Sequence, residues 1–290
     1  MISSIPLSWI TDYRSTTFKH KPGTRLASED EAVDYINQRG FIFFWPVKGA
    51  ILPSLWGAVA GDRPVADAHD DPGHASWGWK DNLLGKRRCY YGRVLRHRNT
   101  FISLDLLPYF YALSPNYGEP AKDYLIEYEE GSLPLETKLV YEALLKFGPL
   151  DTITLRKEAH LSSRESDGRF NKALDSLQST FRVLPVGVSD SGAWHYSFFY
   201  DLVPHHFPNL IEQAHPISES EARRRILAVY LNTVGITTIA EAARLFSWSI
   251  DDTRRSMEYL VQQGLSFEVS VEKVQDRCYC AYAFLQKYGG

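Results

Sequence analysis

Cysteine is scarce in this sequence, which has three cysteines in 290 residues. Cys278 and Cys280 are two positions apart and would point to the same face of a strand, where adjacent positions do not suit a disulfide. An odd count with this spacing excludes a disulfide framework and favours reduced thiols. The sequence therefore predicts a cytoplasmic protein.

Long apolar runs are also absent. No stretch reaches the roughly 18 apolar residues that a membrane-spanning helix needs. The opening residues, Met1-Ile-Ser-Ser-Ile-Pro-Leu-Ser-Trp9, lack the basic segment and apolar run of a signal peptide. We expect no membrane partner and no secretion signal.

The chain as a whole has no excess of positive charge. Its net charge is −3 and its pI is near 6.3, so overall charge does not mark a nucleic-acid-binding protein. Hydrophobic residues make up 44% and charged residues 23%, as is usual for a globular chain with a buried core. The length suggests two or three domains.

One stretch departs strongly from this balance. Residues 80–98 carry a net charge of +6, so the rest of the chain sums to −9. Lysines and arginines this close repel one another unless an anionic partner neutralises them, and interleaved aromatic rings can stack on bases. The alternative is a solvated helix face over an aromatic core. The predicted contacts with double-stranded DNA are Trp77, Trp79, Lys80, Lys86, Arg87, Arg88, Arg93, Arg96 and Arg98.

An acidic loop precedes the basic stretch. Residues 66–74 are rich in Asp, Pro and Gly and include His69 and His74. Their carboxylates and imidazoles are of the types that bind metals or act in acid–base chemistry, but the spacing matches no metal motif. The alternative is that these side chains cap turns in a surface loop. We expect no metal and no cofactor.

The second half of the chain contains a weak internal repeat, in which Gly235 stands 87 residues after Gly148. Hydrophobic periodicity, caps and turn residues predict the elements of each copy. The first copy is predicted to have helices over 136–147, 151–160 and 164–178 and strands over 181–188 and 194–202. The second is predicted to have helices over 221–233, 237–246 and 251–263 and strands over 267–271 and 278–284.

This order of helices followed by a two-stranded wing is typical of a winged helix. We predict an α+β fold that is mostly α, with tandem winged-helix domains and β wings. The third helix of each copy mixes basic with acidic residues, so packing and reading of a DNA groove both stay open for it. The predicted divisions are a helical or winged-helix-like domain over 1–115, a linker over 116–134, and winged helices over 135–215 and 216–290. A monomer is expected.

Three segments carry a resemblance to a known family: Trp77-Gly-Trp-Lys-Asp81, Leu84-Gly-Lys-Arg-Arg88 and Leu106-Leu-Pro-Tyr-Phe-Tyr-Ala-Leu113. Together with Leu55-Trp56 and the tandem repeat, they make the chain similar to the AlkZ/YcaQ-type DNA glycosylases, and most of all to their AlkZ-related branch. The resemblance implies a DNA-repair protein without a metal. It also implies monofunctional hydrolysis of the N-glycosidic bond of alkylated or crosslinked bases in duplex DNA.

The catalytic motif of that family, Gln–apolar–Gln or Gln–apolar–Asp, is not preserved. Its positions fall on Phe44-Trp45-Pro46, none of which can position a water. Hydrolysis through a cationic sugar needs a carboxylate or amide beside the cation. The candidate substitutes are Asp70, Asp71 and Asp81.

Each candidate has a structural alternative. Asp70 and Asp71 would be loop caps, and Asp81 would pair with Lys80. Trp45 is a candidate for stacking on a displaced base, with core packing as its alternative. For the whole chain, the alternatives to a glycosylase are a non-catalytic winged-helix protein that binds DNA or a lesion, and an interaction scaffold.

Overall fold

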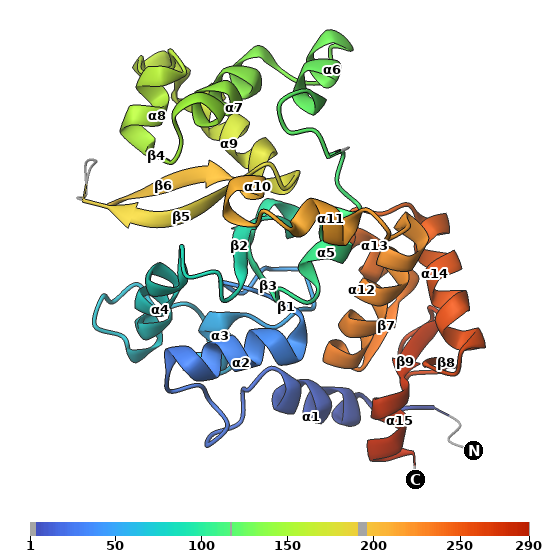
Figure 1. Cartoon of the computed structure of the whole chain (residues 1–290). Coiled ribbons are helices and arrows are strands. Elements are labelled where there is room, and N and C mark those ends of the chain that lie inside the picture. The colour runs from blue at the N-terminus through green and yellow to red at the C-terminus, as the bar shows by residue number, and fades with distance from the viewer. Residues whose placement is uncertain (1–3, 117, 191–195, 290) are drawn as a thin grey trace.

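The computed structural model describes residues 4–116, 118–190 and 196–289. Three successive modules repeat one order of elements: a helix, a strand, two helices and two strands (Figure 1). The first module, residues 29–102, contains α2 (Glu29–Arg39), β1 (Phe41–Phe43), α3 (Leu55–Ala60), η1 (Pro72–His74), α4 (Ala75–Leu83), β2 (Tyr90–Arg93), η2 (Leu95–His97) and β3 (Asn99–Ile102).

The other two modules follow the same plan. The second module, residues 135–202, contains α7 (Leu135–Phe147), β4 (Leu150–Asp151), α8 (Thr152–Glu158), η3 (Arg164–Ser166), α9 (Asp167–Ser179), β5 (Val183–Ser189) and β6 (Ser197–Leu202). The third module, residues 219–281, contains α12 (Glu219–Val234), β7 (Ile236–Thr238), α13 (Ile239–Phe246), α14 (Ile250–Gln262), β8 (Ser266–Val269) and β9 (Cys278–Ala281).

Short helices join the modules and flank them. They are α1 (Leu7–Thr17), α5 (Leu107–Tyr111), α6 (Asp123–Glu129), α10 (Val203–His206), α11 (Leu210–Ala214) and α15 (Tyr282–Tyr288). Across residues 4–116, 118–190 and 196–289, no helix combines the length and apolarity needed to cross a membrane.

Each module has a three-stranded antiparallel sheet of the same topology. The orders are β1-β3-β2, β4-β6-β5 and β7-β9-β8, so the last strand of each module lies in the middle of its sheet. The predicted mixture of dominant helices and small β elements is confirmed. The sequence repeat had covered only the second and third modules, whereas the structure extends the same order to the first.

Local signals place the helices close to their predicted positions. Ser28 accepts a hydrogen bond from the Glu31 amide at the start of α2, and Gly40, with φ of 77°, ends that helix. Asp151 accepts hydrogen bonds from the amides of Ile153 and Thr154 and so caps α8 as predicted. The predicted strand over 278–284 ends at Ala281 and continues as α15. Trp194 and His195, predicted to begin a strand, lie outside the described residues.

The first and third modules share a hydrophobic core, which also takes in Phe181 and Leu184, and the first module has a further core of its own around α2 and α3. Phe41 of β1 packs against Phe246 of α13, with ring centroids 5.8 Å apart. The N-terminal helix α1 joins this body, because the Tyr13 hydroxyl donates to the Asn232 carbonyl of α12 at 2.7 Å. The second module has a separate core built from α7, α8 and α9. This module lies above the other two in Figure 1.

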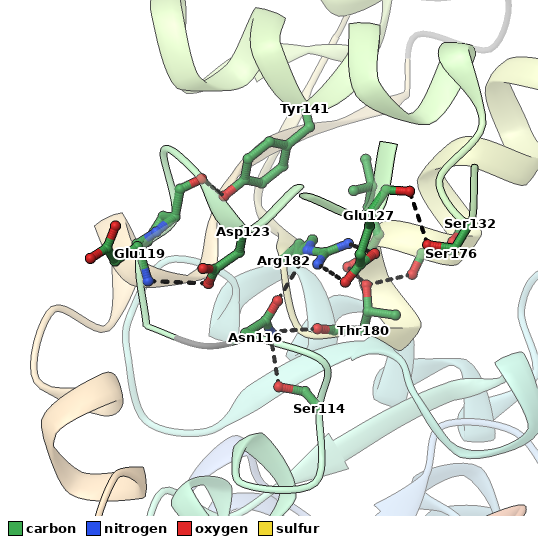
Figure 2. Close-up of polar contacts among 12 residues, drawn as sticks. Ser114, Asn116, Glu119, Asp123, Glu127, Ser132, Tyr141, Ser176, Thr180 and Arg182 are labelled. Carbon is green, nitrogen blue, oxygen red and sulfur yellow. Dashed lines mark hydrogen bonds and ion pairs between the residues drawn. The ribbon is translucent and has the colours of Figure 1, made fainter. Parts of the chain in front are cut away.

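The segment predicted as a linker is anchored to the second module. It contains α6 and is held by Arg182, which is 3% exposed. The guanidinium donates to both carboxylate oxygens of Glu127, at 2.6 and 2.9 Å, and to the Asn116 side-chain oxygen at 3.0 Å (Figure 2). Because a buried guanidinium is costly without such partners, these contacts hold Asn116 and α6 against the second module.

Candidate nucleic-acid interface

The basic stretch does not form one surface. It covers the end of α4, a turn, and the hairpin of β2 and β3, so that its side chains point to separate places. The alternative prediction, that these residues form a solvated face of a helix, is also wrong, because the stretch is not one helix.

Lys80 is the buried member of the stretch, with 1% exposure. Its Nζ lies 2.5 Å from Asp81 Oδ1, donates to the Tyr196 hydroxyl at 2.5 Å, and lies 4.7 Å from the centre of the Trp77 ring. Burial lowers the pKa of Lys80, and the hydrogen bond and charge of Asp81 oppose that shift. The ammonium group joins α4 to the second module and is shielded from solvent. This position removes Lys80 from the predicted DNA contacts.

Three other cations of the stretch lie away from any common pocket. Lys86 donates to Glu29 at 3.0 Å and Arg88 to Asp30 at 2.7 Å, so both are paired with acids at the start of α2. Exposed pairs of this kind are weak, but they already neutralise part of the local charge. Arg87 lines a different hollow, beside α10 and α11, of about 560 Å³.

The remaining cations gather around a pocket of about 480 Å³. One wall is the segment after β1 and the other is the β2–β3 hairpin. We call it the Trp45 pocket; it is lined by Trp45, Pro46, Val47, Lys48, Arg93, Arg96, His97, Arg98 and Asn99. Among the described residues no acid lines it, and Lys48, Arg96 and Arg98 have no ion pair there. Of the three predicted positions of the family motif, Trp45 and Pro46 line the pocket, whereas Phe44 is buried.

A tight turn builds the hairpin wall. The Arg98 amide donates to the Leu95 carbonyl at 2.9 Å, and Arg96 and His97 between them have φ of 52° and 55°. Positive φ at both central residues is the mark of a type I′ turn, which normally takes Asn-Gly. Two successive left-handed residues that are not glycine cost roughly 1–2 kcal/mol each. The turn presents Arg96 and His97 between the Trp45 pocket and a second hollow, of about 480 Å³, beside the third module.

The hairpin is braced by α9 of the second module. His97 Nδ1 lies 2.8 Å from Asp175 Oδ2, and Arg93 Nη1 lies 3.4 Å from Asp175 Oδ1. The Arg93 amide also donates to Gln178 at 3.3 Å. The last turns of α9 therefore pack on the first module. His97 was missed in the sequence because its partner lies 78 residues away in the chain.

The tryptophans differ in what they expose. Trp45 is half-buried against Phe44, Trp56 and Trp77, with its ring centroid 6.0 Å from that of Trp77. Trp77 is 41% exposed and Trp79 is packed against the core of the first module. Trp45 is the one of these three rings that lines the pocket.

The three candidate carboxylates lie outside the pocket lining. Asp71 accepts from the Gly73 amide at 2.7 Å and pairs with Arg63 at 2.6 Å, and the Arg63 hydrogen bond lowers the pKa of Asp71. Asp81 accepts from the Tyr196 hydroxyl at 2.7 Å and is the partner of Lys80. Asp70 is exposed in the turn before Asp71. The predicted alternatives of a loop cap for Asp71 and a Lys80 pair for Asp81 are both present in the structure.

Within residues 4–116, 118–190 and 196–289, no cluster of His, Cys, Asp or Glu side chains could hold a metal ion.

Comparison with known proteins gives one family and one similar structure. The family model described as AlkZ related matches residues 26–247. The fold is similar to that of the Streptomyces sahachiroi DNA glycosylase AlkZ, with a TM-score of 0.64 and 12% identity over 99% of this chain and 72% of that one. No curated protein matches. The predicted family is confirmed, and the chain belongs to the AlkZ-related family.

Proposed function

We propose that the protein binds duplex DNA and hydrolyses the N-glycosidic bond of an alkylated or crosslinked base at the Trp45 pocket. Family membership and the fold shared with a DNA glycosylase support this proposal. The observation that carries it is the lining of the pocket, which combines one indole ring with four cations and no acid. An indole can stack on a displaced base while cations hold the flanking phosphates.

The proposed reaction needs little general-acid catalysis. An alkylated base is already cationic, so its bond to the sugar breaks without a proton donor, and the sugar becomes cationic as the bond breaks. The needed groups are a stacking surface for the base, cations for the backbone, and a positioned water. Trp45 would supply the first, and Lys48, Arg93, Arg96 and Arg98 the second.

The three modules are, in this proposal, three winged helices that together hold the duplex. Their common order of elements and sheet topology support this assignment. The proposal also includes a monomeric state and a cytoplasmic location. The proposed domain boundaries are those predicted from the sequence, at 1–115, 116–134, 135–215 and 216–290. Trp77, Trp79, Lys86, Arg87 and Arg88 remain proposed outer contacts to the DNA.

A non-catalytic DNA- or lesion-binding protein is the second candidate. The apolar motif positions at Phe44 to Pro46 favour it, as does the engagement of Asp71 and Asp81 with other side chains. Both candidates predict binding to duplex DNA, and only the first predicts chemistry.

Chromatography of the supernatant after incubation with N-alkylated and crosslinked duplexes separates the candidates. The glycosylase proposal predicts a free modified base and an abasic strand in the presence of a chelator. Tight, salt-dependent binding without any released base would establish the binding candidate instead.

A further inference from the structure

His97 is a histidine in the Trp45 pocket with a carboxylate behind it. Its side chain is 63% exposed, and Nδ1 is within hydrogen-bond distance of Asp175, at 2.8 Å. We propose that His97, oriented by Asp175, is the catalytic base that binds and deprotonates the hydrolytic water in this pocket. This inference rests on the proposed glycosylase function and names the group that the missing glutamine motif does not supply.

The position of Asp175 favours one form of the ring. Nδ1 faces Asp175 Oδ2 at 2.8 Å, so an ionised carboxylate there favours the neutral form of His97 that carries its proton on Nδ1. Nε2, on the other side of the ring, then carries a lone pair. Arg93 contacts the other oxygen of the same carboxylate, at 3.4 Å, and so helps to fix its orientation.

The location of the pair fits the proposed chemistry better than the carboxylates predicted from sequence. His97 lines the same pocket as Trp45 and Pro46, at the place where the family motif would stand. Asp71 is committed to Arg63 and the Gly73 amide, and Asp81 to Lys80 and Tyr196. Asp175 itself serves as a positioning residue, because it acts on the water through the imidazole.

The proposed step conserves atoms and charge. A water hydroxyl donates to His97 Nε2 while its oxygen forms a bond to the anomeric carbon of the sugar. The bond from that carbon to the base nitrogen breaks, and its electron pair leaves with the base, which becomes neutral if it was cationic. The proton on Nε2 then passes to solvent, so one water is consumed and no other reactant is needed.

The backbone of the turn supports a role for His97 beyond packing. Arg96 and His97 both have left-handed φ, a conformation that a glycine would adopt at lower cost. Residues held in such conformations cluster at active and binding sites. Here the conformation brings the imidazole to the pocket and to a carboxylate of another module.

The test compares single-turnover base release from an N-alkylated duplex by the full-length wild type, His97→Ala, Asp175→Ala and, as the control, His215→Ala. His215 is also exposed but lines a different hollow. General-base catalysis is worth about 100-fold to 10,000-fold, so we expect a loss of at least about 100-fold for His97→Ala. Duplex affinity should stay within about twofold, and added imidazole should restore part of the rate.

The possible results separate this inference from the function on which it rests. If the wild type releases no base, the proposed function fails and takes the inference with it. If the wild type releases base and His97→Ala matches its rate, the inference alone is wrong. A matching loss of release and of duplex affinity in His97→Ala would also overturn it, because His97 would then serve binding.

A second measurement does not depend on activity. NMR of the histidine ring nitrogens should show His97 protonated on Nδ1 in the neutral wild-type protein. Asp175→Ala should lose this preference, since the acceptor is removed, and should also release base more slowly. A neutral His97 protonated on Nε2 in the wild type would contradict the proposed role of Asp175.

Discussion

The sharpest consequence of the structure concerns two pairs of cations from the same stretch. Arg96 and Arg98 line the Trp45 pocket without an ion pair in the described part of the chain, whereas Lys86 and Arg88 are paired with acids of α2. The variants Arg96→Gln/Arg98→Gln and Lys86→Gln/Arg88→Gln remove the same charge. Only the Arg96→Gln/Arg98→Gln variant should lose two full contacts to phosphates.

The magnitude follows from counterion release. Each phosphate contact on duplex DNA contributes about −0.9 to the slope of log affinity against log salt, so losing two contacts should reduce the slope by about 1.8. Since this contribution vanishes near 1 M salt, the loss amounts to about 30-fold in affinity at about 0.15 M salt. The Lys86/Arg88 variant should lose clearly less, because Glu29 and Asp30 already neutralise its cations.

Fluorescence anisotropy of a labelled duplex, titrated at several salt concentrations, measures both slopes. The reasoning is refuted if the two double variants lose equal affinity, or if the Lys86/Arg88 variant loses more. Either result would place the duplex on the surface beside α2 and not at the pocket.

Three further predictions concern base stacking, anchoring and pH. Trp45→Ala should raise the activation free energy of base release by roughly 1–3 kcal/mol, the contribution of one stacked base, and should leave the salt dependence of duplex affinity unchanged. Trp45→Phe should keep most of the rate, and single-turnover kinetics measure both variants. Arg182→Met leaves Glu127 and its neighbours without their buried partner, so it should lower the free energy of unfolding, measured in urea, by about 3–5 kcal/mol. The control Arg164→Met, at an exposed arginine, should lower it by about 0.5 kcal/mol or less. Burial, and then the charge of Arg87, lower the pKa of His206 from its usual 6.5, so the unfolded chain takes up that proton first. The free energy of unfolding should therefore fall as the pH drops below 6.5, and urea titrations of His206→Gln should show a weaker dependence.

Local patterns in the sequence were enough to predict the second and third modules. Their helices begin at recognisable caps such as Asp151 and end near glycines, and the hydrophobic spacing identifies the buried faces. The first module was predicted only as a helical or winged-helix-like domain, because β1 has three residues and β2 lies inside a charged segment and is buried at three successive positions without alternation. Its membership of the repeat is visible only through the pairing of β1 and β2 with β3.

The candidate site was predictable only in part. Charge and aromatic content marked residues 77–98, and three of the marked cations, Arg93, Arg96 and Arg98, meet Trp45 in one pocket. Composition cannot tell that Lys80 faces inward, since its partner Tyr196 directly precedes β6, 116 residues further along the chain. The contact between His97 and Asp175 joins two modules and leaves no mark in either local pattern.

Formation of abasic sites at saturating protein tests the central claim most directly, because binding is then not limiting. An N-alkylated duplex incubated with chelator should accumulate alkali-sensitive sites at the modified base with the wild type and with Lys86→Gln/Arg88→Gln. It should accumulate far fewer with Trp45→Ala and with His97→Ala. Equal rates for all four proteins would contradict the assignment of the Trp45 pocket, and an absence of sites with the wild type on alkylated and crosslinked duplexes would contradict the glycosylase function itself.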